Sequence, residues 1–148
     1  MLNCFIFQDK YIIITKNTVR TLDDVLLETP FQISFASMFE NRLILVNDHS
    51  KSSVNLYELS QGPPKLLTTT TFASTVSSIL YASRLILAFW NSDSLLLFDP
   101  SLEHKQQLLL EVGPTSIIGL AMTEDETLIC TTTQGQLLTL NALEACPV

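Results

Sequence analysis

The sequence predicts an all-β protein: an array of about four units, each of four antiparallel strands, with the last unit one strand short. Two motifs recur at a nearly constant interval. The leucines of the first motif are spaced by 42 and 43 residues, at positions 43, 85 and 128. Equivalent residues of the second motif are spaced by 41 and 42 residues, at positions 57, 98 and 140. The third observation is that no stretch shows a helical period of 3.6 residues, and the six prolines all fall between the expected strands.

Each motif has the composition of a short strand. The runs are four to six residues long, are rich in Ile, Leu, Val, Thr and aromatic residues, and are bounded by turn residues. The copies of the first motif are 10–14, 42–46, 84–88 and 127–131, and those of the second are 18–23, 54–58, 95–99 and 137–141. The connectors between them contain Asn, Asp, Ser and Gly, which favour turn geometry, so each pair predicts a hairpin.

Further apolar runs complete the units. A strand is expected before each hairpin, at 5–7, 33–39, 76–82 and 117–122, and a fourth strand after the first three hairpins, at 25–27, 65–72 and 107–112. Four short antiparallel strands in roughly 40 to 45 residues are typical of a propeller blade. We therefore expect one propeller-like domain over 1–148, with blades at about 4–29, 31–72, 74–113 and 115–143. The last blade lacks its fourth strand because the sequence stops at Val148.

The second motif carries a resemblance to the WD-repeat family. The third strand of that family commonly ends in Trp-Asp, and the matching positions here hold an apolar residue followed by an acid or an amide. These pairs are Leu22-Asp23, Tyr57-Glu58, Phe98-Asp99 and Leu140-Asn141. The last blade, over 118–140, most resembles blades of cilium- and flagellum-associated WD-repeat proteins. The Trp-Asp and Gly-His pairs of the family are absent, so the hydrogen-bonded tetrad of regular WD blades is not expected.

Composition excludes several classes of protein. The net charge is −7, from 8 basic and 15 acidic residues. Binding to nucleic acid is not expected, because the sequence has no basic run that could displace the counterions of the phosphates. No apolar stretch approaches the roughly 20 residues that a membrane-spanning helix needs, and no signal peptide is expected. The three cysteines (Cys4, Cys130 and Cys146) are widely spaced, which favours a reduced intracellular protein. We expect the protein to be cytoplasmic, and the nucleus and the cilium are the alternative locations.

Catalytic and metal-binding motifs are absent from the sequence, and no cofactor is expected. Both histidines, His49 and His104, fall in polar turns. The acid cluster 124–126 is expected at an exposed hairpin tip, and the adjacent carboxylates 23 and 24 at a strand edge or turn. Cys130 is expected to be an inert core thiol because it lies within an apolar strand.

The candidate partner-binding residues are three basic residues and one tryptophan. Lys10, Arg42 and Arg84 occupy the same place in successive units, just before the second strand, and equivalent positions of a propeller lie on a ring. Such a basic arc could meet an acidic partner, or it could be a repeated solvated strand end. Trp90 follows a second strand and could anchor a partner or pack in the core.

The expected function is a non-catalytic interaction or scaffold subunit of a multiprotein complex, binding through blade loops and open terminal blades. The alternatives are a propeller-type hydrolase of the glycosidase or lactonase kind and a phosphoinositide-binding propeller. An unclosed array leaves strand edges that proteins usually cover. The first blade could donate a strand, two copies could join, or a partner or longer parent chain could supply strands. We favour the last of these.

Overall fold

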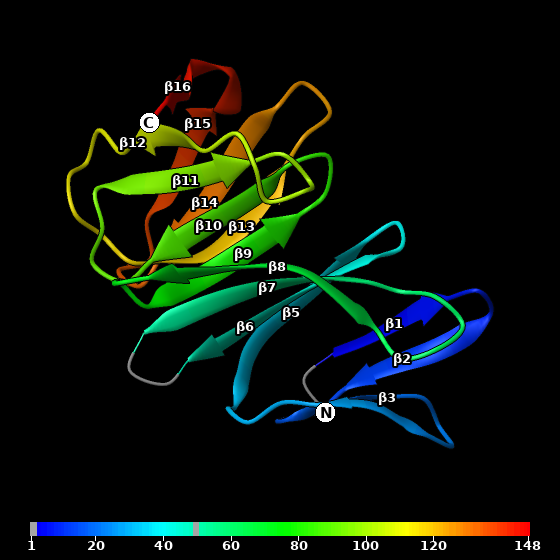
Figure 1. Ribbon diagram of the computed structural model, residues 1–148. Helices are drawn as coiled ribbons and strands as arrows, with labels where there is room; N and C mark the ends of the chain where they lie inside the picture. Colours follow the sequence, from blue (N-terminus) through cyan, green and yellow to red (C-terminus); the bar gives the residue numbers. More distant parts are fainter. Residues whose placement is uncertain (1–2, 49–50) are drawn as a thin grey trace. The chain divides into compact units, whose positions relative to one another are not determined.

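The computed structural model describes residues 3–48 and 51–148 (Figure 1). It confirms the all-β class, since the described residues contain no α-helix and are organised as four antiparallel sheets. None of these residues belongs to a helix that is long and apolar enough to cross a membrane. The chain divides into two compact units, a first unit over 1–73 and a second unit over 74–148.

The first unit holds two four-stranded sheets. One contains β1 (Asn3–Phe7), β2 (Lys10–Ile14), β3 (Thr18–Arg20) and β4 (Val25–Glu28) in this order. The other contains β5 (Ile33–Phe39), β6 (Arg42–Asp48), β7 (Ser52–Glu58) and β8 (Lys65–Phe72). A buried cluster that includes Ile14, Val19, Ile33 and Leu45 combines residues of both sheets into one core. Burial alternates along β1 and β3, so one face of their sheet contributes to that core, whereas β6 is buried at every residue over 43–47.

The second unit holds a five-stranded and a three-stranded sheet. The strands of the five-stranded sheet are β9 (Val76–Tyr81), β10 (Leu85–Phe89), β11 (Ser94–Phe98), β12 (Gln106–Leu109) and β16 (Cys146–Pro147). The three-stranded sheet contains β13 (Ile117–Met122), β14 (Thr127–Thr132) and β15 (Leu137–Asn141). Ile86, Leu97, Leu128 and Cys130 belong to the buried cluster that joins the two sheets. The expectation that the last sheet lacks a fourth strand is confirmed, since the described residues form only three strands there.

The repeat alignment also predicts burial correctly. Leu43, Leu85 and Leu128 lie on β6, β10 and β14, and each has no exposed surface. The repeat alignment therefore identifies a buried position on the second strand of each of these three sheets.

Three local features differ from the expected pattern. The strand expected at 18–23 stops at Arg20, because Thr21 and Asp24 close a turn through the Thr21 N–H to the Asp24 carbonyl at 2.8 Å. The fourth strand expected at 107–112 is β12, which ends at Leu109. After β15, a single 3-10 turn, η1 (Ala142–Glu144), leads to β16, which pairs with β12. The sequence did not predict this last strand.

Candidate functional site

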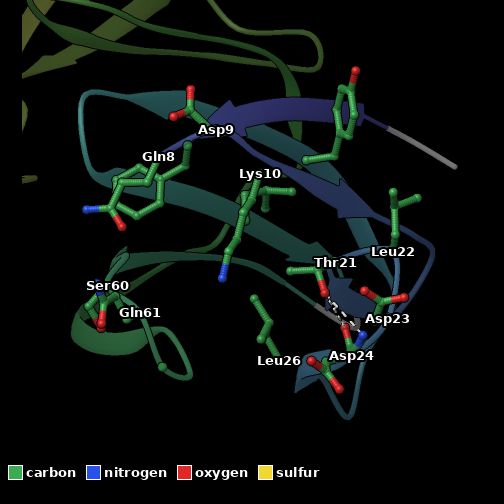
Figure 2. Close-up of a pocket in the computed structure, with 14 residues that line it drawn as sticks. Gln8, Asp9, Lys10, Thr21, Leu22, Asp23, Asp24, Leu26, Ser60 and Gln61 are labelled. Atoms are coloured by element: carbon green, nitrogen blue, oxygen red, sulfur yellow. Dashed lines mark hydrogen bonds between the residues drawn. The ribbon is translucent and has the colours of Figure 1, made fainter.

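A groove opens at one end of the first unit, where three connections between strands meet (Figure 2). The connections are the β1–β2 turn, the β3–β4 turn and the segment that follows β7. We call this site the Lys10 groove, because Lys10 lies among its lining residues; it has a volume of about 380 Å³. Its lining is Phe7, Gln8, Asp9, Lys10, Tyr11, Ile12, Thr21, Leu22, Asp23, Asp24, Leu26, Ser60, Gln61 and Gly62.

Tight turns fix two walls of the groove. Gln8 and Asp9 both have positive φ, 49° and 62°, as in the two-residue hairpin turns that match the twist of the flanking strands. In the β3–β4 turn, the Asp24 N–H donates to the Thr21 hydroxyl at 3.1 Å. These local hydrogen bonds hold the backbone that presents the groove side chains.

The polar groups of the groove are mostly uncommitted. Figure 2 shows Lys10 in the middle, with Ser60 and Gln61 on one side and Leu22, Asp23 and Asp24 on the other. Within the described part of the chain, the side chains of Lys10 and Asp23 make no hydrogen bond or ion pair. The groove therefore offers an ammonium and several carboxylates to a ligand.

Apolar surface lies beside these charges. The side chains of Leu22 and Tyr11 line the groove, and the two residues are 69% and 53% exposed. Leu26 adds a half-buried aliphatic side chain. An arrangement of apolar surface with a few charged groups is suited to binding a side chain or a short peptide.

The other proposed partner-binding residues lie elsewhere. Arg42 is the first residue of β6, half-buried and opposite Glu58 in the strand register. Arg84 precedes β10 in the second unit, and Trp90, which follows β10, is 48% exposed. Arg42 therefore shares a unit with Lys10 but does not line the Lys10 groove, whereas Arg84 and Trp90 belong to the other unit.

The guanidinium of Arg84 is engaged inside the second unit. Its Nε donates to the Glu126 carboxylate at 2.8 Å, and a second nitrogen donates to the other oxygen at 3.3 Å. A third nitrogen donates to the Gln106 side-chain oxygen at 3.2 Å. Arg84 therefore ties β12 and the β13–β14 turn together, which is a structural use of this basic residue.

The β11–β12 loop contains a second charged pair. The His104 Nδ1 lies 2.5 Å from the Asp99 carboxylate, whose other oxygen accepts the N–H groups of Ser101 and Glu103 at 2.9 and 3.1 Å. The hydrogen bond that the His104 ring donates to the Asp99 carboxylate raises the pKa of His104. For Asp99, partial burial raises the pKa, but the hydrogen bonds from His104 and the two backbone groups outweigh it, so the pKa is lowered.

Asp99, Glu103 and His104 also lie close enough together to be considered as metal ligands. Both oxygens of Asp99 already accept hydrogen bonds from within the loop. The cluster is thus explained as a device that fixes the loop backbone, in the manner of other aspartates in turns.

The remaining candidates have the following places. Glu124 and Asp125 lie exposed at the β13–β14 turn, as expected, while Glu126 is half-buried in its ion pair with Arg84. Burial raises the pKa of the Cys130 thiol to about 11, in agreement with an inert core cysteine. His49 lies outside the described residues.

Of the groove residues, only Lys10 was predicted from the sequence to bind a partner, while Asp23 and Asp24 were expected at a strand edge or turn. Ser60, Gln61 and Gly62 meet the first sheet only through folding, some 50 residues along the chain from Lys10. One feature of the sequence could have indicated this site. Successive antiparallel strands alternate in direction, so every second connection in the repeat lies at the same end of a sheet, and all three connections of the groove are of this kind.

No family model and no curated protein matches the sequence. Among solved structures, the chain is similar to the N-terminal domain of Nup159, a β-propeller, with a TM-score of 0.61 and 15% identity. The match covers 92% of this chain and 39% of that one, so the chain spans about two fifths of the length of the Nup159 domain. Together, the four antiparallel sheets and this similarity show that the chain has the fold of a β-propeller-like array.

Proposed function

We propose that the chain is a non-catalytic protein–protein interaction module of the WD-repeat-like propeller class. We further propose that it is a scaffold subunit of a larger intracellular complex. The observation that carries the proposal is the Lys10 groove, in which uncommitted charges and exposed apolar side chains lie together at the end of two adjoining sheets. Three unpaired cysteines accord with a reducing compartment.

The charges of the groove favour a basic partner segment. Three aspartates (Asp9, Asp23 and Asp24) face one lysine in the lining, so carboxylates exceed ammonium groups by two. A Lys or Arg side chain of the partner would pair with these carboxylates, and an adjacent apolar side chain would cover Leu22 and Tyr11. The net charge of −7 on the whole chain would attract the same kind of partner over longer distances.

The same residues do not form a catalytic arrangement. No histidine or cysteine is among the described residues that line the Lys10 groove. Asp23 and Asp24 are exposed neighbours in a turn, without the burial that prepares a carboxyl group for acid or base catalysis. Binding is therefore the function that this groove supports best.

The test compares partners recovered with wild-type chain and with a charge-reversed groove. Asp23→Lys combined with Asp24→Lys is expected to abolish recovery of a defined set of proteins from the native cell, measured by quantitative mass spectrometry. Glu28→Lys in β4 is the matched control, because Glu28 is exposed on the same sheet but does not line the groove. Equal recovery with the groove variant and the control would refute the role of the groove.

A further inference from the structure

Within the described residues, the third strand of the last sheet, β15, has a neighbour on one side only. In the other three sheets, the third strand (β3, β7 or β11) lies between a second and a fourth strand. β15 pairs with β14, and none of the described residues pairs with its other edge. The internal repeat thus identifies the missing element as one antiparallel strand.

The register shows which backbone groups of β15 are open. The Ala142 N–H donates to the Glu126 carbonyl, and the Thr132 N–H donates to the Gln136 carbonyl, at 2.9 and 3.0 Å. In an antiparallel pair, hydrogen-bonded and non-hydrogen-bonded positions alternate, so even-numbered residues of β15 face β14. The N–H and C=O groups of Leu137, Thr139 and Asn141 are therefore directed to the open edge.

This edge lacks the features with which proteins protect exposed strands. The five residues of β15 include neither a charged residue nor a proline. The fourth strand of each other sheet differs in this respect: β4 contains Glu28, β8 begins with Lys65 after two prolines, and β12 is covered by β16. Leu137 on β15 is 67% exposed and Ile129 on the same face is 37% exposed. The edge and the face beside it are therefore uncharged and partly apolar, as is typical of a surface that another polypeptide covers.

The residues that follow β15 are used elsewhere. Ala142 in η1 is buried, and the chain then runs to β16, where Cys146 pairs with Gln107 on β12 (Figure 1). The segment next in sequence is thus committed to the neighbouring sheet. Residues 142–148 therefore do not supply a fourth strand to the last sheet.

We propose that β15 is a docking edge for an extended segment of a partner protein, which adds to the sheet as its fourth, antiparallel strand. The side chains of Leu138 and Leu140 are half-buried against the core of the second unit, so partner residues opposite them need apolar side chains. The partner residue between these two apolar residues lies opposite Thr139, exchanges two backbone hydrogen bonds with it, and therefore cannot be proline. The recognised pattern is apolar–X–apolar, with X any residue except proline.

The chain itself contains an example of this pattern. In and just after β12, Leu108, Leu109 and Leu110 are 5%, 65% and 6% exposed. The outer two side chains enter the core of the second unit, and the middle one faces solvent. The side chains of a partner strand on β15 are expected to alternate between the core and solvent in the same way. Addition of a strand to a sheet edge is a known mode of peptide recognition.

The test uses the full chain and the octapeptide KQQLLLEV, which has the sequence of residues 105–112. At saturating peptide, hydrogen exchange of the Thr139 amide, followed by NMR, is expected to slow by about tenfold or more. The matched peptide KQQLPLEV, with proline in the middle position, is expected to give no protection. Thr139→Val retains the amide and the response, whereas Thr139→Pro removes the outward N–H and abolishes peptide binding.

The outcomes separate this proposal from its alternatives and from the Lys10 groove. Retained exchange protection at Leu128 shows that Thr139→Pro still folds. Absence of protection at Thr139, or equal binding of the proline peptide, would overturn the proposal. So would a wild-type dimer in light scattering that Thr139→Pro converts to a monomer, because the occupant would then be a second copy. The Asp23→Lys, Asp24→Lys variant is expected to bind the peptide normally.

Discussion

At the scale of single residues, the repeated leucines are the most consequential positions. Leu128 has no exposed surface and belongs to the core between the two sheets of the second unit. Replacing it by alanine removes buried methyl groups and leaves a cavity. We expect Leu128→Ala to lower the free energy of unfolding by about 2–5 kcal/mol in urea denaturation.

Leu109→Ala is the matched control, because Leu109 lies in the same unit and is 65% exposed. Its effect is expected to stay within about 0.5 kcal/mol, as for other surface substitutions. Similar losses from the two substitutions would contradict the burial pattern on which the repeat alignment depends.

The pair of His104 and Asp99 predicts a pH dependence. Because the pKa of His104 is raised above 6.5, its stabilising contribution is complete below pH 6.5 and is lost as pH rises through the raised pKa. The lowered pKa of Asp99 gives a contribution that is present above pH 3.8 and is lost as pH falls through the folded value. The pair is therefore expected to stabilise the loop most between these two values.

The measurement is an NMR titration of the His104 imidazole. Its signal is assigned as the one that is absent from the spectrum of His104→Gln. The midpoint is expected above 6.5 in the wild type and lower in Asp99→Asn, which removes the charge and the strong acceptor. An unchanged midpoint in Asp99→Asn would show that the pair does not form in solution.

At the scale of elements, strands could be predicted where hydrophobic pattern and repeat agree. β5 and β15, for example, begin and end at the expected residues, because their apolar runs are bounded by clear turn residues. β16 could not be predicted, because two residues have no periodicity and their pairing with β12 is a long-range contact. The Lys10 groove was missed for the same reason: its walls are brought together by packing and share no local motif.

The pairing of β16 with β12 predicts a local change in hydrogen exchange. The Val148 N–H donates to the Lys105 carbonyl, so by alternation the Gln107 amide donates to Cys146, while the Leu108 amide faces β11. Removing residues 146–148 is expected to accelerate exchange at Gln107. Exchange at Leu108 should be nearly unchanged, and it provides the control within the same strand. Equal acceleration at both amides would show that β12 as a whole has separated from β11.

At the scale of the whole molecule, the two surfaces that we propose for binding belong to different units of the chain. Each unit buries its own core, with Ile14 and Val19 in the first and Ile86 and Leu97 in the second. The Lys10 groove belongs to the first unit and the β15 edge to the second. A scaffold with one groove for a basic segment and one edge for a strand could bind two different partners.

The position of Cys130 gives the protein a built-in reporter of unfolding. Cys4 and Cys146 are exposed, whereas Cys130 is buried in the core of the second unit with a pKa raised to about 11. Because the thiolate is the reactive form, brief alkylation of the native protein is expected to modify Cys4 and Cys146 and to spare Cys130. In increasing urea, the mass of the peptide that contains Cys130 should shift only when the second unit opens, so its labelling would follow that unit's stability without any added probe.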